Sequence, residues 1–361
     1  MTIIPMAFLC VNVKDCGDIL KKDIKSYTLE KLNKEIKDMG LPAFRAKQIY
    51  KWLHQRFVLS FDEMSDLSID LREQLKDMFY INHLKIKRKL VSKIDGTTKY
   101  LFELVDGETI ESVVMKYKYG NTICISSQVG CKMGCKFCAS TLGGKIRDLS
   151  PSELEDQIIF AQNDLGEKIS NIVMMGIGEP LDNFDNVCDF LENLSSKEGQ
   201  NISLRHLSLS TCGICDKIQK LAEKKLQLTL SVSLHAPTDE IRNTIMPVNK
   251  RWNIDELLDS CRKYIDATGR RISFEYALIS GVNDSDECAK KLSAKLKGML
   301  AHVNLIPVNE VKERGFEKSS KVRVQSFCDI LNNSGTTATV RRKLGADIEA
   351  ACGQLRRDNT K

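Results

Sequence analysis

The stretch TICISSQVGCKMGCKFC, residues 122–138, carries the strongest signal in this 361-residue chain. Its first six residues have the composition of a strand, and a tight loop with Cys131, Cys135 and Cys138 follows. Three thiolates at this spacing can bind three irons of a [4Fe–4S] cluster and leave the fourth iron open to an external ligand. The alternative is a structural zinc site, which usually takes four protein ligands in paired arrangements that are not evident here. The spacing therefore favours the cluster.

Strand-like and helical segments alternate from residue 110 onward. The strand-like segments are residues 122–127, 171–176, 205–211, 228–235, 272–279 and 302–308. The helical segments between them are residues 150–166, 187–196, 215–226, 254–269 and 286–298. Six β/α repeats predict an α/β fold with a parallel sheet and helices outside. Polar residues or glycine at the strand ends, where ligands bind in such folds, favour a partial (β/α)6 TIM-like barrel over a doubly wound sheet.

The N-terminal part has a different pattern. Residues 28–78 predict three short helices, which start near Thr28, Phe44 and Ser68. Two strand-like segments, residues 83–91 and 98–105, then flank an Asp-Gly turn signal. We expect a small helical and hairpin domain over residues 1–110, the barrel over 111–345 and a C-terminal tail over 346–361.

Composition and charge narrow the class of protein. No apolar run approaches the roughly 20 residues that span a bilayer, and the first residues lack the features of a secretory signal, so we expect a cytoplasmic protein. Residues 1–100 hold 19 Lys and Arg against 13 Asp and Glu, an excess of six that equals the net charge of +6. A polyanion partner explains this placement, although a solvated surface would too.

The chain contains thirteen cysteines, a high number for its length, but most of them need no special role. In a reducing cytosol, cysteines are more often metal ligands, redox groups or small buried hydrophobes than disulfide partners. The eight that we expect to be buried hydrophobes are Cys10, Cys16, Cys188, Cys212, Cys215, Cys261, Cys288 and Cys328. Cys352 differs, because it lies in a glycine-flanked polar tail that has little core to join.

A second motif, GIGEP at residues 176–180, ends the strand-like segment 171–176. Its glycines let the backbone approach a ligand, and the Glu179 carboxylate can accept hydrogen bonds from an ammonium group. With the cysteine loop, this motif resembles the radical S-adenosylmethionine (SAM) superfamily. The resemblance implies a [4Fe–4S] cluster held by Cys131, Cys135 and Cys138, whose open iron chelates SAM.

Four stretches are similar to the RlmN/Cfr family of RNA adenine methyltransferases: residues 123–141, 176–183, 231–250 and 341–356. Residues 40–68 also match the N-terminal helical domain of RlmN, so the resemblance covers nearly the whole chain. It implies that Cys352 accepts a methyl group from a first SAM and that a second SAM supplies a radical. It further implies that Cys124 resolves the protein–RNA adduct through a transient disulfide with Cys352, and that Glu111 accepts a proton. Matched SAM contacts are Gly178, Glu179, Ser210, Ser233, Leu234, His235 and Asn309.

The same resemblance implies substrates and partners. These are one adenosine in the peptidyl transferase region of 23S rRNA and the adenosine beside the anticodon in tRNAs, both methylated at carbon 2. Carbon 2 of adenine is not nucleophilic, so a radical is needed to make the bond. Flavodoxin or ferredoxin would supply electrons, the N-terminal domain would dock RNA, and we expect a monomer with no membrane contact.

Alternatives stay open at this point. Cys124 could be an inward-facing core residue, Glu111 could sit on a strand edge, and His235 could be a core histidine. The activity could instead be Cfr-like methylation at carbon 8, which confers antibiotic resistance. A zinc-dependent RNA-binding protein without catalytic activity is the second class of alternative.

Overall fold

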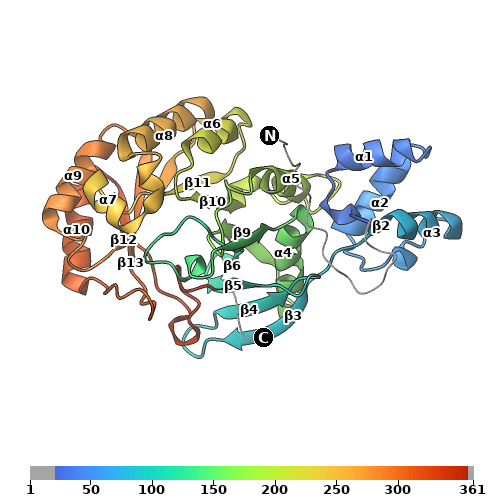
Figure 1. The fold of residues 1–361 in the computed structure, drawn as a ribbon, viewed down its shortest axis with the longest axis horizontal. Coiled ribbons are helices and arrows are strands. Elements are labelled where there is room, and N and C mark those ends of the chain that lie inside the picture. Colours follow the sequence, from blue (N-terminus) through green and yellow to red (C-terminus); the bar gives the residue numbers. More distant parts are fainter. Residues whose placement is uncertain (1–20, 357–361) are drawn as a thin grey trace, which may run out of the picture.

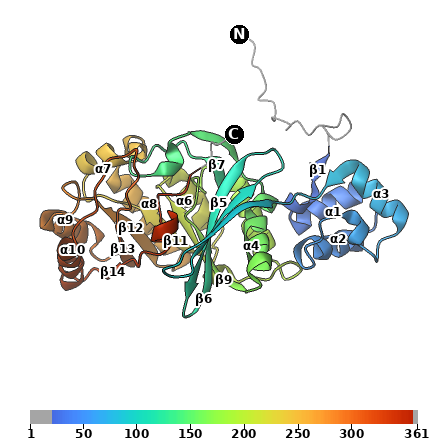
Figure 2. The ribbon, with the colours of Figure 1, turned by 90° about the horizontal axis from the view of Figure 1, so that it is seen from below.

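A computed structural model describes residues 21–356, so Cys10 and Cys16 lie outside the described residues. One ten-stranded sheet, in the order β14-β13-β12-β11-β10-β9-β6-β5-β4-β3, organises the molecule. Figures 1 and 2 show helices α1–α3 at one end of the long axis and α9 and α10 at the other, with β5 and β6 between them.

The larger part of the sheet is parallel. Its strands are β6 (Gly120–Cys124), β9 (Ile169–Met174), β10 (Leu207–Thr211), β11 (Thr229–Ser233), β12 (Ile272–Leu278), β13 (Ala301–Pro307) and β14 (Ala338–Val340). The helices in the crossovers are α4 (Pro151–Leu165), α5 (Phe184–Ser195), α6 (Cys215–Glu223), α7 (Asp239–Ile245), α8 (Ile254–Thr268), α9 (Asp286–Leu296) and α10 (Lys321–Asn333). Six helical crossovers join these strands, and β6 pairs with β5 instead of closing onto β14. The predicted partial (β/α)6 barrel is confirmed.

Local sequence signals set the ends of these helices. At the start of α4, the Ser150 hydroxyl accepts a hydrogen bond from Glu153 N, and the Glu153 carboxylate accepts one from Ser150 N. The helix ends at Gly166, whose left-handed backbone suits glycine. Helix α8 has the same reciprocal cap from Asn253 and Glu256. Such caps explain why the helical segments could be placed from the sequence.

The three predicted N-terminal helices are present as α1 (Leu29–Asp38), α2 (Phe44–His54) and α3 (Ile69–Met78). Thr28 and Ser68, near which two of these helices were expected to start, cap α1 and α3, because each hydroxyl accepts a hydrogen bond from a backbone N–H of the first turn. Short strands β1 (Lys22–Asp23) and β2 (Phe79–Tyr80) pair in parallel and close this helical module. Its core is separate from that of the barrel and runs from Ile24 to Ile81.

The predicted hairpin is present as β3 (Lys85–Val91) and β4 (Thr98–Glu103), but it does not belong to the helical module. It continues through β5 (Thr109–Tyr117) into β6, so it extends the barrel sheet with antiparallel strands. Tyr100 and Phe102 of β4 are fully buried in the core of the barrel. The two cores therefore divide near residue 82, earlier than the expected boundary at 110, because the buried face of the hairpin packs on the barrel.

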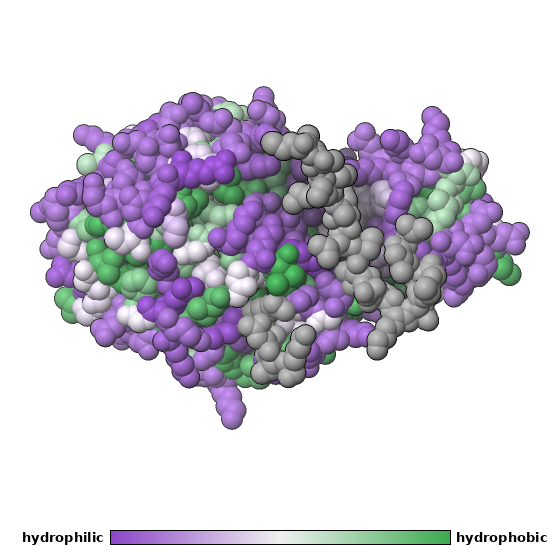
Figure 3. Space-filling view, in the orientation of Figure 1, coloured by the Kyte–Doolittle hydropathy of each residue, from purple (hydrophilic) through white to green (hydrophobic). Residues whose placement is uncertain are grey.

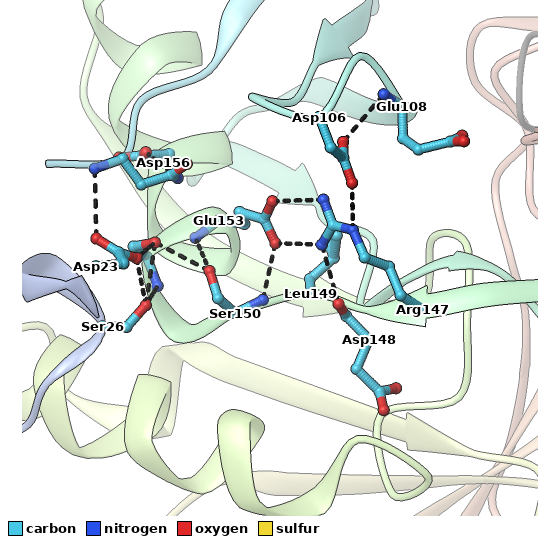
Figure 4. A network of polar contacts seen from close by, with 12 residues as sticks. Asp23, Ser26, Asp106, Glu108, Arg147, Asp148, Leu149, Ser150, Glu153 and Asp156 are labelled. Atoms are coloured by element: carbon cyan, nitrogen blue, oxygen red, sulfur yellow. Dashed lines mark hydrogen bonds and ion pairs between the residues drawn. The ribbon is translucent and has the colours of Figure 1, made fainter. Parts of the chain in front are cut away.

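Polar contacts fasten the helical module to the barrel near the start of α4 (Figure 4). Asp23 accepts a hydrogen bond from the hydroxyl of Ser152. Next to Ser152, Glu153 accepts hydrogen bonds from the Arg147 guanidinium on both carboxylate oxygens at 2.8 Å. Arg147 Nε also donates a hydrogen bond to the Asp106 carboxylate at 2.6 Å. The polar network thus links β1, the start of α4 and the loop before β5.

One buried ion pair and one buried contact between a histidine and a carboxylate also join the helical module to the barrel. Lys25 forms an ion pair with Asp156, and both side chains are almost completely buried. His54 Nδ1 lies 2.8 Å from a carboxylate oxygen of Glu155, also in the interior. Buried pairs of this kind are costly to break one partner at a time.

Two elements beside the cysteine loop were not expected from the sequence: strands β7 (Gln128–Gly130) and β8 (Lys145–Asp148), which pair as a small antiparallel sheet. Helices α7 and α10 and strand β14 were not expected either. Within residues 21–356 no helix is both long and apolar enough to cross a membrane.

Candidate active site

The cysteine loop is held at the mouth of the barrel by backbone contacts. Cys131 N donates to Gly144 O at 3.0 Å, and Lys136 N donates to Ile245 O at 2.8 Å. Gly130 has φ of +75°, and a Cβ there would lie 1.8 Å from Gly144 O, so only glycine fits. The loop is therefore fixed against the strand pair β7–β8 on one side and the end of α7 on the other.

Cys131, Cys135 and Cys138 line one cavity at the carboxyl ends of the parallel strands. Burial raises the pKa of Cys131 to about 12 and raises the pKa values of Cys135 and Cys138 as well. Iron binds thiolates, and a bound metal ion supplies the positive charge that deprotonates such thiols. Among residues 21–356, no three His, Cys, Asp or Glu side chains meet closely enough to hold a single metal ion. In a [4Fe–4S] cube each cysteine sulfur binds a different iron, so the three thiols do not have to meet around a single ion.

Glu179 lies in the same cavity and is held by the backbone around it. One carboxylate oxygen accepts a hydrogen bond from Cys212 N at 2.7 Å, and the other accepts one from Leu181 N at 3.0 Å. Burial raises its pKa despite these bonds. The Glu179 carboxylate is thus a fixed acceptor in the cavity, suited to a ligand ammonium.

His235 follows β11 with a left-handed backbone, φ +57°, which is uncommon for a residue other than glycine. Its Nδ1 accepts a hydrogen bond from Ala277 N at 2.8 Å, so the neutral ring carries its proton on Nε2. Burial, helped by Arg242, lowers the pKa of His235 to about 3. The ring of Phe137, in the cysteine loop, packs edge-on against the His235 ring, with the two ring centroids 4.9 Å apart. His235 is therefore a neutral side chain that lines the cavity.

The structure brings most of the other expected SAM contacts to this cavity. Its lining includes Gly178, Ser210, Ser233 and Asn309. Leu234 is not among the lining residues, because its side chain is buried in the barrel core.

Cys212 is buried as expected, and it also lines the cavity. Its thiol is buried, yet its backbone N–H holds Glu179. Cys215, Cys261, Cys288 and Cys328 are buried as expected, and Cys188 is half-buried.

The C-terminal tail crosses the mouth of the barrel and places Cys352 in the cavity wall. Asn309 Nδ2 donates to Cys352 O at 3.1 Å, and Ala139 N donates to Gly353 O at 2.8 Å. The expectation that this tail has little core to join is wrong. Ala350 and Leu355 are buried in a small cluster with residues of β5 and β6, since the antiparallel strands extend the sheet beneath the tail.

A second cavity meets the first at Cys352, which lines both. Cys124, at the end of β6, lines the second cavity and is 6 % exposed. Burial raises the pKa of Cys124 to about 12, and the neighbouring Cys352 is a smaller cause of the same shift. Both cysteines are free thiols in the structure. The second cavity also has a basic wall, which contains Lys318, Lys321, Arg341, Arg342 and Lys343.

Glu111 is buried on β5 and reaches the tail rather than a strand edge. One carboxylate oxygen accepts a hydrogen bond from Arg356 N at 2.9 Å, and the other lies 3.1 Å from Lys99 Nζ. The carboxylate thus joins the sheet to the segment that follows Cys352.

In the view of Figure 3, hydrophobic residues gather over the middle of the barrel part, and hydrophilic residues form its rim.

Comparison with known proteins shows to which class of protein this fold and its cysteine loop belong. A family model described as the radical SAM superfamily matches residues 125–292, and one described as the ribosomal RNA large subunit methyltransferase N-terminal domain matches residues 22–81. The open barrel and its three-cysteine loop define a radical SAM enzyme.

The relatives narrow the class to one family. The chain is 54% identical over 340 residues to a probable dual-specificity RNA methyltransferase RlmN of Clostridium perfringens (strain SM101 / Type A), covering 94% of this chain and 98% of that protein. It is 55% identical over 337 residues to the same kind of protein from Alkaliphilus oremlandii (strain OhILAs), covering 93% and 98%. The chain belongs to the RlmN family. A radical SAM methyltransferase from Sphaerobacter thermophilus has the same fold, with a TM-score of 0.86, 41% identity and coverage of 92% of this chain and 98% of that one.

Proposed function

We propose that this enzyme methylates carbon 2 of an adenosine in RNA, once in 23S rRNA and once beside the anticodon of tRNAs. The observation that carries the proposal is the position of Cys352, which lines both the cavity of the three loop cysteines and the cavity of Cys124. Cys352 therefore borders both the proposed SAM site and the basic cavity that an RNA base would enter. Family membership supports the choice of RNA.

The residues have separate roles in this proposal. Cys131, Cys135 and Cys138 hold the [4Fe–4S] cluster, and Glu179 accepts hydrogen bonds from the SAM ammonium. When bound, the cluster and a second SAM would supply a 5′-deoxyadenosyl radical, which takes one hydrogen atom from the methyl group on Cys352 so that its carbon can bond to carbon 2 of the base. The adduct would give up one electron to the cluster, and Glu111 would accept the proton from carbon 2. The Cys124 thiolate would then attack the Cys352 sulfur to form a transient disulfide; the bond from that sulfur to the methylene carbon would break, and its electron pair would take up a proton there to complete the methyl group.

The N-terminal part supports a role in docking RNA. Phe44 at the start of α2 is 60 % exposed, and the Arg45 guanidinium lies over its ring at 4.8 Å. The exposed strand β3 carries Lys85, Lys87, Arg88 and Lys89. Exposed aromatic and basic side chains suit RNA bases and phosphates. We propose that residues 1–110 dock RNA, that residues 111–345 form the catalytic barrel and that residues 346–361 form the tail; within the docking part, strands β3 and β4 extend the barrel sheet.

Further proposals concern the setting of the reaction. The enzyme works in the cytoplasm as a monomer, away from membranes, and takes electrons from flavodoxin or ferredoxin. Reduction with purified flavodoxin and its reductase in place of a chemical reductant tests the donor, and light scattering of the purified protein tests the monomer.

Genetic complementation tests the proposed substrate. A strain that lacks its own carbon 2 methyltransferase receives this gene, and digested 23S rRNA and tRNA are analysed by mass spectrometry. We expect 2-methyladenosine in both RNAs. Only 8-methyladenosine would show the Cfr-like activity instead. A colourless zinc protein from anaerobic purification, without iron and sulfide, would support the zinc alternative.

A further inference from the structure

Arg242, on α7, is fully buried, and its guanidinium spans the ends of two neighbouring parallel strands. Its Nη2 donates hydrogen bonds to Cys212 O at 2.8 Å, just after β10, and to Ser233 O at 3.0 Å, at the end of β11. Its Nε donates to Leu234 O at 3.0 Å, and its Nη1 donates to Asn249 Oδ1 at 2.8 Å. One side chain is thus bound to β10, to β11 and to the 3-10 helix of Asn249 that follows α7.

The acceptors around Arg242 are all neutral oxygens, three from backbone carbonyls and one from a side-chain amide. Arg147, by contrast, pairs with the carboxylates of Asp106 and Glu153. Burial of a charged group among neutral groups is unfavourable, and burial lowers the pKa of Arg242 accordingly. The guanidinium offers five N–H donors in a rigid planar fork. The geometry of these donors, which reaches several carbonyls at once, therefore explains an arginine at this position.

The strand ends that Arg242 binds belong to the proposed SAM site. Cys212, whose carbonyl accepts one of these hydrogen bonds, holds the Glu179 carboxylate through its own N–H at 2.7 Å. Ser233 and His235, which flank another of the acceptors, both line the cavity of the cysteine loop. Arg242 itself is not among the residues that line this cavity. It therefore contacts the backbone behind the site and not the space that a ligand would fill.

The same helix also contacts the cysteine loop. Ile245 O, about one turn after Arg242 on α7, accepts a hydrogen bond from Lys136 N of the loop at 2.8 Å. A Cβ at Gly134 would lie 3.4 Å from Pro247 Cγ, so the loop also packs against the segment that follows α7. Helix α7 and this segment thus contact the cysteine loop on one side and, through Arg242, the strand ends on the other.

We propose that Arg242 is a positioning residue that holds the SAM-contacting ends of β10 and β11 at a fixed place relative to the cysteine loop. This inference rests on the proposed function, because it assigns a support to the proposed SAM site. Without the guanidinium, three carbonyls on these strand ends lose their donors. The backbone that places Glu179 and His235 is then free to shift, so SAM fits less well although the three cysteines are unchanged.

Binding of S-adenosylhomocysteine tests this role without requiring methyl transfer. Wild type and variants are reconstituted anaerobically with iron and sulfide and titrated with S-adenosylhomocysteine by isothermal calorimetry. The same ligand is titrated into the reduced proteins, and the change in the electron paramagnetic resonance signal of the cluster is followed. The variants are Arg242→Met, which removes the charge and the fork, and Arg242→Lys, which keeps the charge alone. Arg262→Gln is the control, because Arg262 is an exposed arginine of the neighbouring helix α8.

We expect Arg242→Met to bind S-adenosylhomocysteine about tenfold more weakly than wild type, with normal iron and sulfide contents. The change in the resonance signal should need about tenfold more ligand. Arg242→Lys should recover little of the affinity, because one ammonium group cannot reach carbonyls on both strands with the geometry of the fork. Arg262→Gln should match wild type.

A purely structural role gives a different result. It would lower the molar ratio of binding, because less protein is folded, and leave the Kd of the folded fraction unchanged, which would overturn the inference. Full recovery of the Kd by Arg242→Lys would overturn it too, because charge alone would then suffice. If Arg242→Met does not fold, Asn249→Ala removes one acceptor of the guanidinium and should weaken binding by a smaller factor. An unchanged Kd in every folded variant contradicts the proposal.

Formation of 2-methyladenosine by wild type is measured separately. Its absence would refute the proposed function, whereas the comparison of Kd values between wild type and variants judges Arg242 alone. The two failures are therefore distinguishable.

Discussion

The side-chain amide of Asn309 donates a hydrogen bond to the backbone oxygen of Cys352 at 3.1 Å. Asn309 follows the end of β13, so the barrel itself holds the tail. The next residue of the tail, Gly353, is bound through its carbonyl by Ala139 of the cysteine loop. The position of the Cys352 thiol is thus set from both sides by the mouth of the barrel.

Replacing the tail cysteine separates methyl loading from cluster binding. We expect Cys352→Ala to abolish the mass increase of one methyl group on the protein, because no other tail residue offers a thiolate. Iron and sulfide contents and the visible spectrum should match wild type, since the cluster ligands lie in the loop at residues 131–138. A Cys352→Ala protein that still gains a methyl group would show that another residue is the acceptor.

Replacing Cys124 stops the reaction after the bond to RNA has formed. We expect Cys124→Ala to accumulate a covalent protein–RNA adduct, visible as a slower band on a denaturing gel that RNase removes. Cys188→Ala is the matched control, because Cys188 is half-buried on α5 and lines neither cavity. Normal turnover by Cys124→Ala would show that the resolving role is wrong.

His235 makes the stability of the fold depend on pH. Its pKa in the folded protein is about 3, below the ordinary value of about 6.5, so the unfolded state binds more protons between these values. Stability from this residue is complete above about pH 7 and is lost as the pH falls towards 3. Between pH 7.5 and 5, wild type should lose about 2 kcal/mol more of unfolding free energy than His235→Gln in urea titrations of the apoprotein. Equal losses in the two proteins would contradict a neutral His235.

The ion pair of Lys25 and Asp156 couples the helical module to the barrel. Asp156→Ala leaves the buried Lys25 charge without its partner, so we expect a loss of about 3–5 kcal/mol of unfolding free energy. The double variant Lys25→Met/Asp156→Leu removes both charges and should lose clearly less, as measured by urea unfolding. A double variant as unstable as Asp156→Ala would show that the loss comes from packing, not from the unpaired charge.

Much of the fold could be predicted because its signals are local. Alternating strand-like and helical segments indicated the β/α repeats, and the expected helix starts near Thr28 and at residue 150 lie within one or two residues of the observed ones. The cysteine loop and Glu179 could be identified because each motif is short and ends a strand. These features depend on neighbours in the sequence.

The parts of the fold and of the site that could not be predicted depend on contacts between residues far apart in the sequence. The sequence of β3 and β4 predicts a hairpin whether it packs on the helical module or on the barrel. Only the pairing of β4 with β5, and of β5 with β6, places the hairpin in the barrel sheet. Cys212 is a core residue as expected, but its hydrogen bond to Glu179 could not be predicted because a backbone N–H makes it.

The most direct test of the central claim follows the methyl hydrogens. Reconstituted enzyme is incubated anaerobically with reductant, substrate RNA and SAM that carries a trideuterated methyl group, and the nucleosides are analysed by mass spectrometry. Because one hydrogen atom must leave the methyl group on Cys352 before it joins the base, we predict 2-methyladenosine with two deuterium atoms. A product that keeps all three, or a methyl group on carbon 8, would contradict the account.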